Sequence, residues 1–272
     1  MTTATPETGR PQDTRTHSPW PRAATASPSG FFPKSLQRRA RASVYKSHPV
    51  FKPPPRRALL WKYVDFTKFV SMLERQALFF STPAKFSDPF EGHYPLGNLR
   101  GLSEDSARGL ARMTEDLRHM VLVDCWHWNQ VESAAMWNLY AEWERGIALQ
   151  TTVGSLQDCL AGPEDVFVGK VKYIDYEKQE IDRHNALTPY LTKRKSFAHE
   201  REVRAISLPL ETQQDGSYHD VDLKMLIGKV IVAPKSQDWF LGLVQAVLDR
   251  YGLTAPVTRS PLAERPAWSA LT

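Results

Sequence analysis

Between residues 58 and 262 the chain alternates short apolar runs typical of β-strands with segments whose apolar residues recur at helical spacing. Most of the strand-like runs are not separated by long helices, so a regular doubly wound parallel sheet fits poorly. The sequence therefore predicts a single α+β domain over 58–262, with a mixed or mainly antiparallel sheet flanked by helices. A flexible tail is expected over 263–272.

The expected elements follow from this periodicity. We expect strands over 59–64, 78–81, 121–128, 146–152, 166–176, 202–208 and 228–233. We expect helices over 66–76, 103–120, 133–142, 153–160, 187–196 and 238–251. On the first strand, alternation places Trp61 and Tyr63 on one face and Lys62 on the other.

Residues 1–57 differ sharply from the rest of the chain. They hold 11 of the 35 Lys and Arg residues and ten of the 20 prolines, but only two acidic residues, Glu7 and Asp13. With so little to bury, this segment is predicted to be a disordered basic arm. It is either a solvated tail or a segment that binds an anionic partner such as nucleic acid or lipid, and an organellar transit peptide is a third interpretation.

The composition limits the class of protein. No run approaches the roughly 20 apolar residues of a membrane-spanning helix, and the N-terminus lacks the apolar core of a secretory signal. Cys125 and Cys159 lack the spacing of a structural zinc site, so two reduced thiols in a cytoplasmic protein are expected. Neither a P-loop nor a Gly-x-Gly-x-x-Gly motif is present.

Glu200 and Glu202 are the strongest candidates for chemistry. They stand two residues apart where a strand begins, so their side chains are expected on one face, where mutual repulsion raises one pKa. Such a pair suits acid–base catalysis or binding of a ribose hydroxyl. The alternative is a purely structural ladder of ion pairs with Lys195, Arg201 and Arg204.

Aromatic residues form a second group of candidates. Four of the eight tryptophans lie between residues 126 and 143. Trp137 and Tyr140 can form a wall on which a base or a nicotinamide ring stacks, or they can be part of the core. His127, between two tryptophans, either faces a cleft or is a buried histidine with its hydrogen bonds satisfied.

A third group, Asp88, Glu91 and His93, lies in a loop rich in turn residues. These side chains can reach one cation, but the loop lacks the spacing of a calcium or zinc motif. No metal site is therefore assigned. A metal-dependent nuclease that uses this loop and Glu202 is a third hypothesis for the function.

Several short motifs occur along the chain in a defined order. They are Trp61-Lys62-Tyr63, Leu78-Phe79-Phe80-Ser81, Phe86-Ser87-Asp88-Pro89-Phe90-Glu91, Cys125, Met136-Trp137 with Tyr140, Gly146-Ile147, Val171-Lys172-Tyr173, Lys193-Arg194, and His199-Glu200-Arg201-Glu202-Val203-Arg204. In this order and spacing the chain resembles, over about 59–262, the bacterial family known as domain of unknown function 2971. That family implies no settled activity.

The order of elements is also similar to that of the ADP-ribosyltransferase superfamily. This resemblance implies NAD as a co-substrate. No metal is expected, because the loop that holds Asp88, Glu91 and His93 lacks the spacing of a metal motif. It implies Glu202 as the catalytic carboxylate, Glu200 as the partner that orients the acceptor, Lys62 or Tyr63 as the first-strand contact, Ser81 as the second-strand support, and Trp137 or Tyr140 as the aromatic wall.

Two functions from different classes follow. The first is an NAD-consuming transferase, a toxin or phage-defence effector that acts on protein or nucleic acid reached through the basic arm. The second is a non-catalytic binding or regulatory module, in which the aromatic cluster forms a recognition pocket and the arm binds an anionic partner.

Overall fold

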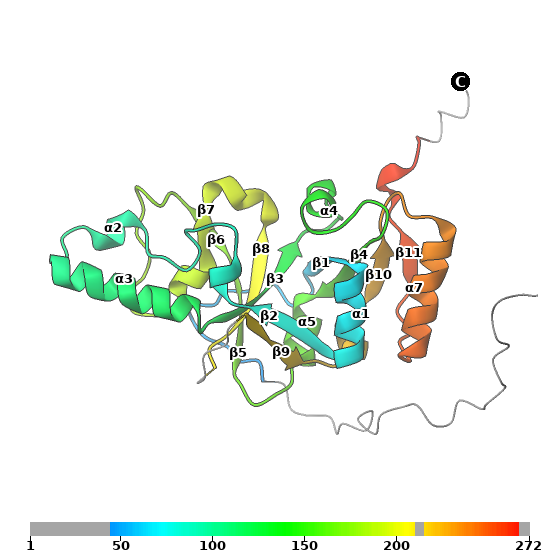
Figure 1. Cartoon of the computed structure of the whole chain (residues 1–272), viewed down its shortest axis with the longest axis horizontal. Coiled ribbons are helices and arrows are strands. Elements are labelled where there is room, and N and C mark those ends of the chain that lie inside the picture. The colour runs from blue at the N-terminus through cyan, green and yellow to red at the C-terminus, as the bar shows by residue number, and fades with distance from the viewer. Residues whose placement is uncertain (1–43, 210–214, 267–272) are drawn as a thin grey trace, which may run out of the picture. The chain divides into compact units, whose positions relative to one another are not determined.

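The computed structural model describes residues 44–209 and 215–266. Within these ranges the chain forms a nine-stranded sheet and a separate two-stranded sheet, with helices packed against the large sheet (Figure 1). Of the strand pairs in the described residues, only β10 with β11 and β6 with β7 are parallel; the others are antiparallel. The fold is therefore α+β with a mixed, mostly antiparallel sheet, as the periodicity predicts.

The elements of the described residues have these bounds. The large sheet contains β1 (Leu59–Asp65), β2 (Ala77–Ser81), β3 (Leu122–Trp128), β4 (Gly146–Thr152), β5 (Val166–Lys170), β8 (Glu202–Ser207), β9 (Gly216–Asp220), β10 (Lys229–Val232) and β11 (Val257–Arg259). The small sheet contains β6 (Lys172–Ile174) and β7 (Thr192–Arg194). The helices are α1 (Phe66–Arg75), α2 (Leu96–Leu99), α3 (Glu104–Arg118), α4 (Ala134–Tyr140), α5 (Val153–Cys159), α6 (Leu223–Leu226) and α7 (Asp238–Arg250). Over the described ranges, none of these helices has both the length and the hydropathy to span a membrane.

Two expected elements are wrong. The helix expected over 187–196 is instead two 3₁₀ turns, Thr188–Leu191 and Lys195–Glu200, on either side of β7. Its apolar residues recur at helical spacing, but the segment between the turns pairs with β6, and this tertiary pairing overrides the local pattern. The strand expected over 166–176 is interrupted and forms β5 and β6.

The large sheet is forked at β3. One edge of β3 pairs with β8 along its length, from Leu122 to His127. The opposite edge meets β2 at Val123, through Ser81, and meets β1 only at its far end, where Trp61 lies opposite His127. Between these two contacts, residues 124–126 pair with β8 alone among the described strands. The strands β1 and β2 thus diverge from β3 and leave an opening in the sheet.

The two faces of the sheet carry different cores. Leu60 and Trp126 belong to a large apolar cluster with residues of α1, α5 and α7. Trp61 and Tyr63 face the other side and pack with Met136 of α4. The alternation expected for the first strand is confirmed, because Lys62 lies between Trp61 and Tyr63 in the strand and bonds to Asp124 instead of joining their cluster.

The folded body begins earlier than the composition indicates. Phe51 is buried and stacks on Phe167 with ring centroids 5.0 Å apart. The Lys46 amide donates to the Val166 carbonyl over 2.9 Å. The boundary expected at residue 57 is therefore wrong for residues 44–57, which pack on the domain. The remainder of the expected arm, residues 1–43, lies outside the described residues, as do residues 267–272 of the expected tail.

Candidate functional site

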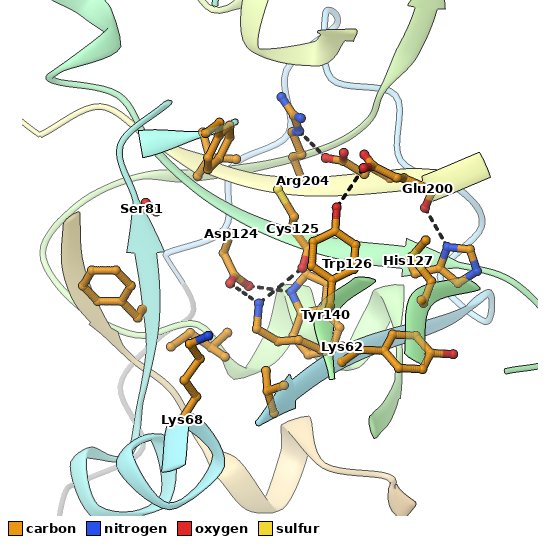
Figure 2. Close-up of a pocket in the computed structure, with 18 of the residues that line it drawn as sticks. Lys62, Lys68, Ser81, Asp124, Cys125, Trp126, His127, Tyr140, Glu200 and Arg204 are labelled. Atoms are coloured by element: carbon orange, nitrogen blue, oxygen red, sulfur yellow. Dashed lines mark hydrogen bonds and ion pairs between the residues drawn. The ribbon is translucent and has the colours of Figure 1, made fainter. Parts of the chain in front are cut away.

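A cavity of about 730 Å³ opens at the fork of the sheet (Figure 2). Because the sheet is open there, the cavity is lined from both faces. Trp61, Tyr63 and His127 contribute from the face that carries α4, and Lys62 and Trp126 contribute from the other. The volume falls within the range of small-molecule binding sites.

Lys62 occupies the opening between β1 and β2. Its ammonium group forms an ion pair with the Asp124 carboxylate and donates to the Cys125 carbonyl over 3.2 Å. The second oxygen of Asp124 accepts from the Trp126 indole over 2.6 Å. Burial raises the pKa of Asp124, while the Lys62 ammonium opposes that rise. The Cys125 carbonyl of β3 thus accepts from the side chain of a neighbouring strand.

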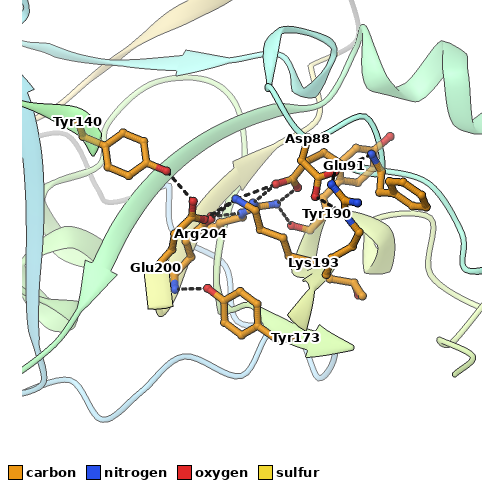
Figure 3. Close-up of polar contacts among 12 residues, drawn as sticks. Asp88, Glu91, Tyr140, Tyr173, Tyr190, Lys193, Glu200 and Arg204 are labelled. Atoms are coloured by element: carbon orange, nitrogen blue, oxygen red, sulfur yellow. Dashed lines mark hydrogen bonds and ion pairs between the residues drawn. The ribbon is translucent and has the colours of Figure 1, made fainter. Parts of the chain in front are cut away.

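A second group of charges lines the cavity on the face that carries α4 (Figure 3). We call it the ion cluster; its members are Glu91, Lys193, Glu200, Glu202 and Arg204. Arg204 binds both oxygens of Glu91, over 2.9 and 3.0 Å, and donates through Nε to Glu202 over 2.6 Å. Lys193 Nζ contacts all three carboxylates, including Glu91 at 3.0 Å and Glu202 at 2.8 Å. The cluster therefore joins the loop before α2 to β7 and β8.

The pKa values of Glu200 and Glu202 differ strongly in this cluster. Burial, followed by the neighbouring Glu202 carboxylate, raises the pKa of Glu200 to about 7, against the opposing effect of Lys193. Burial also acts to raise the pKa of Glu202, but Arg204 and Lys193 outweigh it and hold that pKa well below its usual value. Glu202 is thus a permanent anion, whereas Glu200 exchanges a proton near neutrality.

The pair is assembled differently from the expected strand alternation. Glu200 ends a 3₁₀ turn, and Arg201 adopts a left-handed conformation at φ 44° before β8 begins at Glu202. Both carboxylates converge on Lys193. The alternative ion-pair ladder is present in part, since Arg204 binds Glu202, but the bridging lysine is Lys193 and not Lys195.

Tyr140 links α4 to the cluster. Its hydroxyl donates to Glu200 Oε1 over 2.8 Å, while its ring remains about half exposed. Burial of the hydroxyl and its hydrogen bond to Glu200 raise the pKa of Tyr140, so the phenol stays protonated. Glu200 is therefore held between one ammonium donor and one phenol donor at the wall of the cavity.

His127 borders the same part of the cavity. Burial lowers the pKa of its ring, so the imidazole is neutral at pH 7. Its Nδ1 lies 2.6 Å from the Glu200 carbonyl and donates to it, which leaves Nε2 as an acceptor. Nε2 is buried and has no hydrogen-bond partner among the described residues.

Six of the seven residues proposed from the sequence line this one cavity. They are Lys62, Tyr63, Ser81, Tyr140, Glu200 and Glu202. Trp137 does not line it. Its ring is fully buried behind Tyr63 at 5.2 Å between centroids, and its indole donates to Glu132 over 2.9 Å, so the expected role of Trp137 as a cofactor contact is replaced by one in packing.

The loop considered for a metal binds cations of the protein instead. Asp88 forms an ion pair with Arg194 at 2.7 Å, and Glu91 is occupied by Arg204 and Lys193. His93 faces Glu115 on α3 at 3.8 Å. Over the described ranges, no group of His, Cys, Asp and Glu side chains has an arrangement that would hold a metal ion.

Sequence reasoning missed Asp124 and underrated Lys193. A signal for Asp124 was present, because an acidic residue within the apolar run 121–126 is buried on a strand only when a cation accompanies it. Nothing local pointed from Asp124 to Lys62, 62 residues earlier in the chain. The role of Lys193 depends equally on contacts between distant segments.

Comparison with known proteins adds no assignment. The chain matches no protein-family model, and no curated protein matches it. The resemblance to the domain of unknown function 2971 family thus stays a prediction from motif order. The site must be interpreted from its own geometry.

Proposed function

We propose that the protein is an enzyme that consumes NAD, cleaving the bond between nicotinamide and ribose and passing ADP-ribose to an acceptor. The observation that carries this proposal is Glu200, a carboxyl with a pKa of about 7 held by Tyr140 at the wall of a cavity at the sheet fork. Carboxyl groups that lie in clefts and have a strongly shifted pKa are typical of active sites. The motif order described above supports the same proposal.

The proposed chemistry assigns distinct roles to the two glutamates. Departure of nicotinamide leaves positive charge on the ribose, and an adjacent carboxylate stabilises that charge in the transition state. Glu202 is poorly placed for this task, because one oxygen binds Lys193 and the other binds Arg204. We therefore assign the role to Glu200 and treat Glu202 as a positioning residue that keeps Lys193 and Arg204 in place.

The rest of the cavity is compatible with a nucleotide. Tyr63 and Phe79 supply apolar ring surface, and Lys68 lies on the other side of the drawn pocket from Glu200 (Figure 2). A ligand with an aromatic end and a phosphate end would place its phosphates toward Lys68. Ser81, which pairs with Val123, also lines the cavity and supplies a hydroxyl to it.

The test is incubation of the purified protein with NAD, with nicotinamide release followed by chromatography. Glu200→Gln should lower the rate by about 10²- to 10³-fold, the loss typical when one electrostatic stabiliser is removed. Glu104→Gln, on the exposed surface of α3, is the matched control and should leave the rate unchanged. No release of nicotinamide together with no NAD binding by calorimetry would overturn the proposal, as would an unchanged rate in Glu200→Gln.

A non-catalytic binding module is the second candidate. The observation that favours it is that each carboxylate of the ion cluster already has hydrogen-bond partners in the protein. In this case the cavity binds a ligand without turnover, and the basic residues before position 58 bind nucleic acid or an acidic protein surface. Removal of residues 1–43 should then weaken nucleic-acid binding and flatten its dependence on salt. An unchanged salt slope would remove that segment from the argument.

A further inference from the structure

The ion cluster has one more carboxylate than it has cations. Among the cations of the described residues, Glu91, Glu200 and Glu202 form ion pairs only with Lys193 and Arg204, and all five side chains are at most 8% exposed. An uncompensated charge at such a depth is costly. The cluster therefore reaches electrical balance in one of two ways: a proton on Glu200, or a positive charge supplied from the cavity.

In the part of the chain that the structure describes, the groups packed around Glu200 supply no further positive charge. Tyr140 of α4 and Tyr173 of β6 are phenols, and burial raises the pKa of each. On β3, burial keeps the Cys125 thiol protonated and the His127 ring neutral.

The flanking side chains point elsewhere. The guanidinium of Arg201 lies over the Trp128 ring, 5.4 Å from its centroid, and His199 is exposed. The neighbouring cation Arg194 is taken by Asp88.

A further feature of this wall points to a ligand. The half-exposed ring of Tyr140 stands directly at Glu200, and aromatic faces attract cations. A flat cation that stacks on this ring would bring its positive charge beside the Glu200 carboxyl.

We infer that the cavity recognises a flat aromatic cation, of the pyridinium class, whose charge lies beside Glu200 and whose binding displaces the proton from that carboxyl. The inference rests on the proposed function, because the nicotinamide ring of NAD is such a cation. It goes further by stating that recognition depends on charge and is coupled to proton release. A neutral ring of the same shape leaves the proton on Glu200, so it gains no electrostatic attraction to that carboxylate.

The test compares 1-methylnicotinamide, which carries the positive charge, with neutral nicotinamide by titration calorimetry. In buffers of low and high ionisation enthalpy at pH 7, the cation should release about half a proton per site, because Glu200 with a pKa of about 7 is half protonated there. The affinity of the protein for 1-methylnicotinamide should be about tenfold weaker at pH 6 than at pH 8, whereas its affinity for nicotinamide should not change. These measurements need no variant, so they hold even if substitutions disturb folding.

Glu200→Gln should abolish both proton release and the preference for the cation, and Glu104→Gln should preserve them. Equal affinity for the two probes, absence of proton release, or no binding of 1-methylnicotinamide would overturn the inference. The probe has no glycosidic bond, so its binding is independent of turnover. Cation preference with neither binding nor cleavage of NAD would support this inference while overturning the proposed function, and NAD cleavage without cation preference would do the reverse.

Discussion

Arg204 is the residue on which the ion cluster most depends. It is 1% exposed, binds Glu91 and Glu202, and donates to the Tyr190 carbonyl over 2.9 Å. Arg204→Met removes one of two cations from three buried carboxylates, so the free energy of unfolding should fall by about 3–5 kcal/mol in urea titrations. The control is Arg108→Met on the exposed side of α3, where loss of the surface pairs should cost at most about 1 kcal/mol. Equal losses in the two variants would contradict this account.

His219 should impose a pH dependence on stability. Burial lowers its pKa from 6.5 to about 4, and its ring packs on Phe80 with centroids 4.2 Å apart. The unfolded chain thus binds more protons than the folded one between these values, and stability falls as the pH drops from 6.5 toward 4, by up to about 3 kcal/mol. Glu200, with its raised pKa, has the opposite effect between about 4.5 and 7.

The His219 contribution is therefore measured as a difference between proteins. The unfolding free energy of His219→Gln, followed from pH 4 to 7.5, should fall less steeply on acidification than that of the wild type. His184→Gln, at an exposed position, is the control. Parallel curves for wild type and His219→Gln would show that the buried ring does not control the slope.

The sequence predicted most of the residues that lie at the candidate site, but not what each of them does there. Its residue types were visible in short motifs, and Tyr63, Ser81 and Glu202 do meet in one cavity. The roles depend on pairings between distant segments. Nothing local reveals that Lys193 and Arg204 occupy both oxygens of Glu202 and leave Glu200 to titrate.

At the scale of elements, strong periodicity located most strands and helices, and the errors have physical causes. The strand β9 was missed because its Ser217, Tyr218 and His219 lack an apolar alternation, and its place is set by pairing with β2. The strand β11 has only three residues and depends on β10. Short elements of this kind are stabilised by tertiary contacts more than by local propensity.

The helix α1 determines how β1 connects to β2, and its first turn is open to a direct test. Asp65 is the N-cap, and its carboxylate accepts from the Lys68 amide over 2.8 Å. Asp65→Ala should lower the unfolding free energy by about 1 kcal/mol, because an amide of the first turn loses its acceptor. Asp65→Asn keeps the capping oxygen and should cost only a fraction of this. Urea titrations in which both variants lose the same amount would point to charge, and not capping, as the source.

At the scale of the whole molecule, the fork in the sheet is the feature that makes the site. The strand β3 meets β8 on one edge and, on the other, β1 and β2, which α1 joins far from β8 in the sequence. The opening brings Lys62 from one face and Glu200 from the other into one cavity. Local sequence patterns predict where strands form but not which strands pair, so they could not predict the fork.

The start of the folded body gives the last prediction. Phe51 packs on Phe167, and a Cβ on Gly169 would lie 3.1 Å from the Phe51 ring, so this contact is close. Arg56 adds an ion pair with Asp158 at 2.5 Å. A chain that begins at residue 44 should keep these contacts, whereas one that begins at residue 58 loses them all. Phe51→Ala alone should lower the unfolding free energy by about 3 kcal/mol.

The measurement is urea denaturation of the full chain, residues 44–272, residues 58–272 and full-length Phe51→Ala. Residues 44–272 should unfold at about the same urea concentration as the full chain, and residues 58–272 at a lower one. The midpoint of Phe51→Ala should lie between those of residues 44–272 and residues 58–272, because this variant loses only part of the contacts. If residues 58–272 and 44–272 unfold at the same midpoint, the segment 44–57 contributes nothing to the folded body. The stably folded body would then begin at residue 58, as the composition predicted, despite the packing of Phe51.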